Sequence, residues 1–124
     1  MSKSPGTLLI VEDDVLVATQ MEDALKDAGY EVLQPARSAN EAMDLARAHR
    51  PALALVDIEL EGQLNGIQLA SQLREELNIP SIFISGHNDP ATVRASQLAQ
   101  PVSWLKKPFG PGSVVASVQL ALKG

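Results

Sequence analysis

The feature that most constrains the fold of this chain is a fivefold alternation between short apolar runs and stretches with helical spacing of apolar residues. Three of the runs are continuously apolar, at Leu8–Val11, Leu53–Val56 and Ile82–Ile84. Such runs are typical of parallel strands that are buried on both faces. Strand and helix in regular alternation predict a parallel sheet joined by right-handed crossovers, so we expect an α/β protein with helices on both faces of the sheet.

The same pattern places the individual elements. The strands are expected at Thr7–Val11, Glu31–Gln34, Ala52–Val56, Ser81–Ile84 and Val102–Leu105. The helices are expected at Val15–Ala28, from Ser38 onward, at Asn65–Leu77, from Asp89 and Pro90 onward, and at Pro111–Leu122. Ser38 with Glu41 three residues later has the spacing of a capping box. Glu31, Gln34 and Pro35 give the second strand the character of an edge strand.

Length and composition narrow the class of protein. The chain has 124 residues, which predicts a single domain over 1–124, with a core at about 7–122 and a flexible N-terminus at 1–6. It contains no cysteine, which excludes a disulfide framework and a cysteine nucleophile. The net charge of −5 argues against nucleic acid and anionic membranes as partners. No apolar stretch has the length of a signal sequence or membrane span, so we expect a cytoplasmic protein.

Polar side chains follow the apolar runs at the points where the strands are expected to end. They are Glu12, Asp13 and Asp14 after the first run, Asp57 after the third, Ser85 and Gly86 after the fourth, and Lys106, Lys107 and Pro108 after the fifth. In a parallel sheet these positions meet at one edge. Clustered carboxylates favour Mg²⁺ over zinc or copper. A carboxylate beside such an ion can accept a phosphoryl group, whose oxygens a lysine and a hydroxyl would hold.

Together these residues resemble the receiver domain of two-component response regulators, over essentially the whole chain from Leu8 to about Leu122. The resemblance implies a (βα)5 doubly wound, five-stranded parallel sheet of flavodoxin-like type, with strand order 2-1-3-4-5. It also implies phosphoryl transfer from a sensor histidine kinase or histidine phosphotransfer protein, with Mg²⁺, or alternatively Mn²⁺, as cofactor. We expect a signalling protein and no enzyme beyond self-phosphorylation and self-dephosphorylation. It would act on an unidentified output protein, as a monomer or a phosphorylation-dependent dimer.

The resemblance assigns the acidic residues their roles. Asp57 matches the phospho-acceptor and is also expected to contact the metal. Asp13 matches a direct metal ligand, and Glu12 matches the acid that acts mainly through water. The backbone carbonyl of Glu59 would complete the protein's share of the metal shell. Asp14 is expected to be a helix cap.

Further matches concern the fourth and fifth strand ends. Ser85 matches the conserved hydroxyl and Gly86 the small residue after it, while Lys107 matches the conserved lysine. Pro108 follows it where the family usually has a cis peptide bond. Trp104 takes the place of the aromatic residue that swings inward on activation, so Ser85 and Trp104 are the expected switch residues.

The chain also departs from the family's usual pattern. The acceptor is followed by Ile58-Glu59-Leu60-Glu61-Gly62, and Gly66 comes one residue later than in the commoner version of this loop. Glu59 and His87 lie two residues beyond Asp57 and Ser85, at positions that in the family influence how fast the phosphoryl group is lost. A plain loop histidine is the simpler interpretation of His87.

Other interpretations stay open from the sequence alone. Asp13 can simply stabilise a helix start, Asp57 can be a strand-end turn residue, and Trp104 can be part of the core. A degenerate receiver that binds partners without phosphorylation is the main alternative function. An aspartate-nucleophile phosphatase is a second, although its nucleophile would follow the first strand. A third alternative is an FMN-binding module. Such a module would need a Ser/Thr-rich phosphate loop after the first run, where this chain has acids instead.

Overall fold

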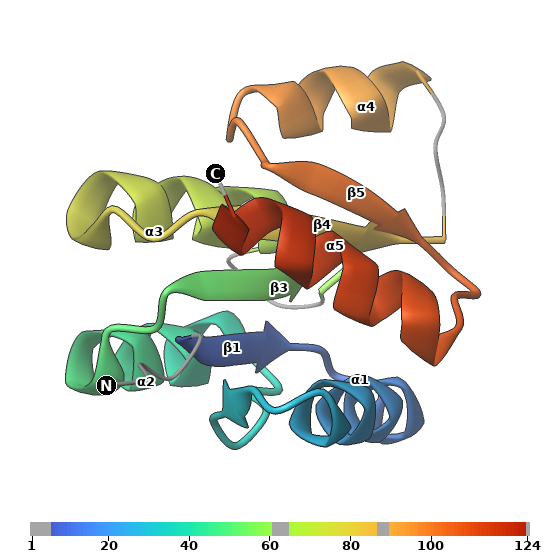
Figure 1. Cartoon of the computed structure of the whole chain (residues 1–124). Coiled ribbons are helices and arrows are strands. Elements are labelled where there is room, and N and C mark those ends of the chain that lie inside the picture. The colour runs from blue at the N-terminus through green and yellow to red at the C-terminus, as the bar shows by residue number, and fades with distance from the viewer. Residues whose placement is uncertain (1–5, 61–64, 87–89, 124) are drawn as a thin grey trace.

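The computed structural model describes residues 6–60, 65–86 and 90–123. Its centre is a five-stranded parallel sheet with the strand order β2-β1-β3-β4-β5 (Figure 1). The strands are β1 (Thr7–Val11), β2 (Glu31–Val32), β3 (Leu53–Asp57), β4 (Ser81–Ser85) and β5 (Ser103–Lys106). The predicted fold class and strand order are therefore confirmed, and β2 is an edge strand as its polar sequence predicts.

Five helices alternate with the strands. They are α1 (Val15–Asp27), α2 (Ala39–His49), α3 (Gly66–Leu77), α4 (Pro90–Gln97) and α5 (Pro111–Lys123). Helices α1 and α5 cover one face of the sheet, and α2 and α3 cover the other (Figure 1). In the described part of the chain, no helix has the length and hydrophobicity that a membrane crossing needs.

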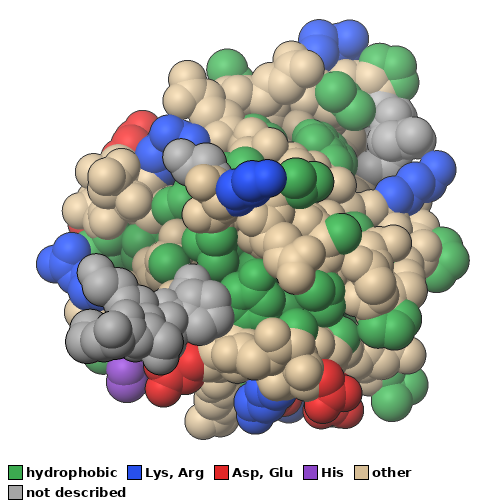
Figure 2. Space-filling view, viewed as in Figure 1, with side chains coloured by type: hydrophobic (Ala, Val, Ile, Leu, Met, Phe, Trp, Pro, Cys, Tyr) green, Lys and Arg blue, Asp and Glu red, His purple; other side chains and the backbone are tan. Residues whose placement is uncertain are grey.

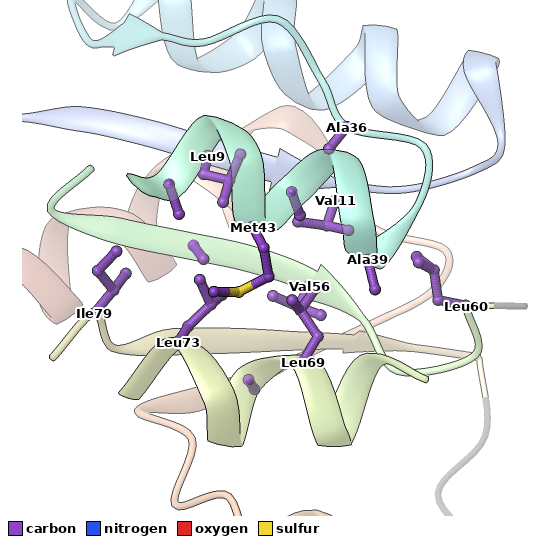
Figure 3. Close-up of a cluster of buried hydrophobic side chains, with 14 of the residues drawn as sticks. Leu9, Val11, Ala36, Ala39, Met43, Val56, Leu60, Leu69, Leu73 and Ile79 are labelled. Atoms are coloured by element: carbon purple, nitrogen blue, oxygen red, sulfur yellow. The ribbon is translucent and has the colours of Figure 1, made fainter. Parts of the chain in front are cut away.

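The sheet separates two layers of buried side chains because successive residues of a strand point to opposite faces. Leu9, Val11 and Val56 point toward α2 and α3, where Met43 extends from α2 into the space between the two helices (Figure 3). Leu8, Ile10, Leu53, Leu55, Ile82 and Ile84 point the other way and pack with α1 and α5. Both faces of the central strands are buried, as their continuously apolar sequences predict.

Element boundaries agree with the predictions to within a residue or two, with β2 the shortest strand. β2 ends at Val32, but the chain continues beside β1, because the Leu33 amide donates to the Leu8 carbonyl at 2.9 Å and the Ala36 amide donates to the Ile10 carbonyl at 2.8 Å. Pro35 lacks an amide hydrogen and interrupts the ladder between these two bonds.

Helix starts follow the predicted capping chemistry, with one correction. The Ser38 hydroxyl accepts a hydrogen bond from the Glu41 amide at 3.1 Å, as a cap should. The reciprocal bond of a capping box does not form, because the Glu41 carboxylate accepts from the Arg37 amide at 2.9 Å instead. The complete capping box of the described residues is at α3, between Asn65 and Gln68. Asp89, the predicted cap of α4, and most of the N-terminus predicted to be flexible lie outside the described residues.

Candidate functional site

Three carboxylates meet at the carboxyl edge of the sheet. Strands β1 and β3 pair with Val11 opposite Val56, so Glu12 and Asp57, each one residue further along, lie side by side at this edge. Glu12, Asp13 and Asp57 each offer one carboxylate oxygen, and these three oxygens lie within 4.8 Å of one another. Glu12 and Asp57 are only 1% and 2% exposed. Negative charge is thus concentrated in a place where water can screen it only weakly.

The ammonium group of Lys107 compensates part of this charge. Its Nζ atom lies 3.2 Å from Oε1 of Glu12 and 3.3 Å from Oδ2 of Asp57. Pairing of β4 with β5 continues in a bond from the Lys107 amide to the Ser85 carbonyl at 2.8 Å, which fixes the lysine at this edge. Burial alone would lower the pKa of Lys107, but the charges of Asp57 and Glu12 outweigh it and raise that pKa above its ordinary value. The side chain is therefore a fixed cation of the site.

The surroundings of the Glu12 carboxyl shift its pKa strongly. Burial, together with the neighbouring carboxyl of Asp57, raises the pKa of Glu12 to about 7, although the Asp14 amide and the Lys107 ammonium oppose this rise. Oε2 of Glu12 accepts a hydrogen bond from the Asp14 amide at 3.1 Å. Oε1 is buried and accepts no hydrogen bond, with Lys107 as its ionic neighbour. A further cation at this edge would stabilise the ionised form of Glu12.

A tight turn after β3 holds the Asp57 side chain in place. Oδ1 of Asp57 accepts a hydrogen bond from the Glu59 amide at 2.8 Å, and the Asp57 carbonyl accepts one from the Leu60 amide at 3.3 Å. The first residue of α3 closes against this turn: a Cβ on Gly66 would lie 2.1 Å from the Asp57 carbonyl oxygen. Only a residue without a side chain fits there. The turn leaves Oδ2 facing Lys107.

The predicted hydroxyl residue lies beside Asp57 but has another partner. The Ile58 amide donates to the Ile84 carbonyl at 3.1 Å, which brings the ends of β3 and β4 together. The buried Ser85 hydroxyl donates to Oε2 of Glu59 at 3.4 Å, and the Gly86 amide donates to Oε1 of the same carboxylate at 3.4 Å. Glu59 therefore reaches from one strand end to the next.

The donor set fits a magnesium ion. Mg²⁺ binds oxygen ligands at about 2.1 Å in an octahedron, so opposite ligands lie roughly 4.2 Å apart. The carboxylate oxygens of Glu12, Asp13 and Asp57 already lie within 4.8 Å of one another, and the buried Oε1 of Glu12 accepts no hydrogen bond. Asp13 is half-buried, whereas Glu12 and Asp57 are buried. Oxygen ligands alone favour this ion over zinc or copper.

The remaining predicted residues have the following places. The Lys107–Pro108 peptide bond is cis, the geometry that the resemblance implied. Trp104 is half-buried on β5 and packs edge-on against Phe83, with ring centroids 5.9 Å apart and an interplanar angle of 87°. Asp14 caps α1, accepting from the Leu16 amide at 3.0 Å and the Val17 amide at 3.4 Å. His87 lies outside the described residues, so its predicted influence on phosphoryl loss stays a prediction.

Two features of the site were not predicted from the sequence. The first is the contact of Gly66 with the Asp57 backbone, for which the glycine itself at a helix start was the available signal. The second is the side-chain contact of Glu59 with Ser85 and Gly86. The family resemblance implies a role for the Glu59 carbonyl and for its position in the loop, but it does not indicate which groups the carboxylate contacts.

Known proteins resemble this chain over nearly its whole length, including all five strands of the sheet. The family model described as the response regulator receiver domain matches residues 8–119. The transcriptional regulatory protein PdtaR of Mycobacterium tuberculosis is 27% identical over 118 residues, which are 95% of this chain and 57% of PdtaR. The phyllosphere-induced regulator PhyR of Methylorubrum extorquens is 32% identical over 116 residues, which are 93% of this chain and 43% of PhyR.

A solved structure matches over a similar extent. The signal receiver domain of a modulated diguanylate cyclase from Desulfovibrio desulfuricans superposes with a TM-score of 0.89 at 35% identity, covering 95% of this chain and 94% of that one. The chain spans about half the length of the curated relatives it matches. The similarity therefore concerns the domain that carries the site, and it does not extend to the rest of those relatives.

Proposed function

The chain belongs to the response regulator receiver family of two-component signalling, and on that premise we propose that Asp57 accepts a phosphoryl group from a phosphohistidine. The donor would be a sensor histidine kinase or a histidine phosphotransfer protein, and the exchange would take place in the cytoplasm. The observation that carries the proposal is the position of Lys107 Nζ, 3.3 Å from the buried Asp57 carboxylate and 3.2 Å from Glu12. A buried carboxylate beside an ammonium group, with two further carboxylates that could hold a metal cation, is an arrangement suited to accepting a phosphoryl group.

The proposed step exchanges one bond for another. A carboxylate oxygen of Asp57 bonds to phosphorus while the P–N bond to the donor imidazole breaks. The electron pair of that bond goes to the imidazole nitrogen, which takes up a proton. Lys107 would hold one phosphoryl oxygen by charge, and the Ser85 hydroxyl would hold another by hydrogen bonding. The Glu59 amide, which donates to Oδ1 of Asp57 at 2.8 Å, orients the acceptor carboxylate for this step.

Glu12, Asp13 and Asp57 would hold the Mg²⁺, with the Glu59 carbonyl as the further ligand that the family resemblance implies. When bound, the ion would neutralise negative charge that develops on the transferred phosphoryl oxygens. Within this proposal Asp13 is a direct ligand and Glu12 acts mainly through water. The chain's own chemistry would then be limited to gaining and losing the phosphoryl group.

Signalling would proceed through a protein partner. A dianion on Asp57 attracts Ser85 and Lys107 and so favours a different arrangement of the fourth and fifth strand and helix units. Figure 2 shows hydrophobic side chains interspersed with polar ones on the face that carries α5. Leu98, Val102 and Leu120 are 85%, 45% and 73% exposed. These residues around α4, β5 and α5 offer apolar contacts to an output protein or to a second copy of the chain.

The test is phosphorylation by a small phosphodonor. Wild-type protein incubated with acetyl phosphate and Mg²⁺ should gain the mass of one phosphoryl group, and the fluorescence of Trp104, the one tryptophan of the sequence, should change. The Asp57→Asn variant should show neither response. Equal responses from the two proteins would overturn the assignment of Asp57. If Mg²⁺ alone changes the Trp104 fluorescence but acetyl phosphate causes no further change and no gain in mass, the alternative of a phosphorylation-independent binding module is favoured.

A further inference from the structure

The carboxylate of Glu59 binds two hydrogen-bond donors at the end of β4. Oε2 accepts from the Ser85 hydroxyl and Oε1 from the Gly86 amide, each at 3.4 Å. Ser85 is fully buried, whereas Glu59 is exposed to solvent. A flexible, charged side chain from the β3 end is therefore fixed over two neighbouring donors of β4. Each of the two donors thus binds a different oxygen of this carboxylate.

These donors lie next to the proposed acceptor. Asp57 pairs with Ile84 in the sheet, so Ser85 and Gly86 follow directly beyond the residue opposite Asp57. Two donors directed at one carboxylate form a small anion site, because hydrogen bonds to charged acceptors are stronger than those between neutral groups. A phosphoryl group on Asp57 would bring a second anion to the same donors. The Glu59 carboxylate and the phosphoryl oxygens then compete for them.

We propose that Glu59 is a positioning residue that occupies the Ser85 hydroxyl and the Gly86 amide while Asp57 is unmodified, and that it releases them when Asp57 carries a phosphoryl group. This inference rests on the proposed function of Asp57. Like charges repel, and the exposed Glu59 side chain has solvent to move into, so the newly formed dianion displaces it. Release has a cost, since two hydrogen bonds of the unmodified state are broken first. Glu59 thereby stabilises the unmodified arrangement of the site.

Three variants separate the contact of Glu59 from its charge. Glu59→Asp keeps the charge but shortens the side chain by one methylene, so the carboxylate no longer spans to β4. Glu59→Gln keeps the reach and loses the charge. Glu59→Ala loses both. If the contact matters, beryllofluoride with Mg²⁺, a phosphoryl mimic, binds roughly three- to tenfold more tightly to the Asp and Ala variants than to wild type, and the Gln variant gains less than the Asp variant.

A second measurement needs no phosphoryl mimic. The amide proton resonance of Gly86 in unmodified, metal-free protein reports its hydrogen bond to Glu59. We expect this resonance to move upfield in Glu59→Asp and Glu59→Ala, while the fold is unchanged by circular dichroism. In a Ser85→Ala background, the gain in mimic affinity from Glu59→Ala should shrink, because one of the two contested donors is gone.

The results that overturn the inference differ from those that overturn the proposed function. A Gly86 resonance that is the same in wild type and Glu59→Asp contradicts the contact. A mimic affinity that rises in Glu59→Gln but not in Glu59→Asp shows that Glu59 acts through its charge alone, and this too overturns the inference. Failure of Asp57 as acceptor is seen separately, as equal mimic binding by wild type and Asp57→Asn.

Discussion

Gly66, the first residue of α3, lies so close to Asp57 that a Cβ on residue 66 would be 2.1 Å from the Asp57 carbonyl oxygen and 2.6 Å from the Ile58 Cα atom. The neighbouring atoms belong to the backbone and cannot turn aside as a side chain could. This contact joins the start of α3 to the turn that orients the acceptor carboxylate. The start of α3 can therefore pack this closely against the Asp57 turn only when residue 66 has no side chain.

We predict that Gly66→Ala lowers the free energy of unfolding by roughly 1–3 kcal/mol, because an overpacked site must move the turn or the helix. The displaced turn should also weaken phosphorylation by acetyl phosphate. Urea unfolding followed by circular dichroism measures the first effect. Gly112→Ala is the matched control, since a Cβ at Gly112 meets nothing within 4 Å and the residue lies in α5. That variant should be neutral or more stable by up to about 1 kcal/mol. Equal stability of the two variants would contradict the close contact.

The two lysines before Pro108 should behave differently. Lys107 lies between Glu12 and Asp57 and is part of the site, whereas Lys106 is exposed. Lys107→Ala leaves two buried carboxylates facing each other without a cation, so we expect the free energy of unfolding to fall by roughly 1–3 kcal/mol, a value reduced from that of a fully buried pair because Lys107 is partly exposed. Lys106→Ala should change it by less than about 0.5 kcal/mol.

Magnesium provides the second arm of the lysine experiment. If Glu12, Asp13 and Asp57 hold the ion, saturating Mg²⁺ should restore part of the stability that Lys107→Ala loses, because the ion replaces the missing positive charge. Urea unfolding of both variants with Mg²⁺ and with a chelator measures the recovery. If Mg²⁺ raises the free energy of unfolding of neither variant, the acidic cluster does not bind the ion in the folded protein.

Much of this fold could be predicted because its signals are local. Continuous apolar runs such as Leu53–Val56 identify central strands, and the polar residues after them identify the functional edge. Features that depend on two segments fitting together could not be read in this way. The reach of Glu59 to Ser85 depends on the turn after β3, and Glu41 binds the Arg37 amide because the chain before α2 brings that amide within 2.9 Å. The tertiary structure determines which of several possible hydrogen-bond donors such a carboxylate binds.

The raised pKa of Glu12 predicts a pH dependence of stability in metal-free protein. Glu12 ionises near pH 4.5 in the unfolded chain and at about 7 in the folded one, so between these values the folded state holds a proton that the unfolded state has lost. The contribution of Glu12 is therefore fully present below pH 4.5 and is lost as the pH rises through about 7, by roughly 3 kcal/mol at most. The raised pKa of Lys107 acts only in the alkaline range, well above this interval.

Glu12→Gln tests this dependence directly. The amide cannot ionise, so the stability of the variant should fall less than that of wild type across the interval from pH 4.5 to about 7. Urea unfolding over this interval in the presence of a chelator gives the two curves. Saturating Mg²⁺ should flatten the wild-type curve, since the ion binds ionised carboxylates and is bound more tightly as the pH rises. Parallel curves for wild type and Glu12→Gln would show that Glu12 is not the group responsible.

The packing of α4 predicts where the domain is least protected. Of the helix residues from Pro90 to Gln97 only Ser96 is buried, and its hydroxyl donates to the Val93 carbonyl of the same helix at 2.8 Å. By contrast, α1 buries Met21 and Leu25 among its apolar contacts. Local opening is easiest where few apolar side chains are buried, so amides of α4 should exchange with deuterium about tenfold or more faster than those of α1.

Beryllofluoride with Mg²⁺ should change the rate of amide exchange in α4 of wild type and leave it unchanged in Asp57→Asn. If the amides of α4 exchange as slowly as those of α1, this helix is a stable part of the core. That result would contradict the proposed rearrangement of the fourth strand and helix unit.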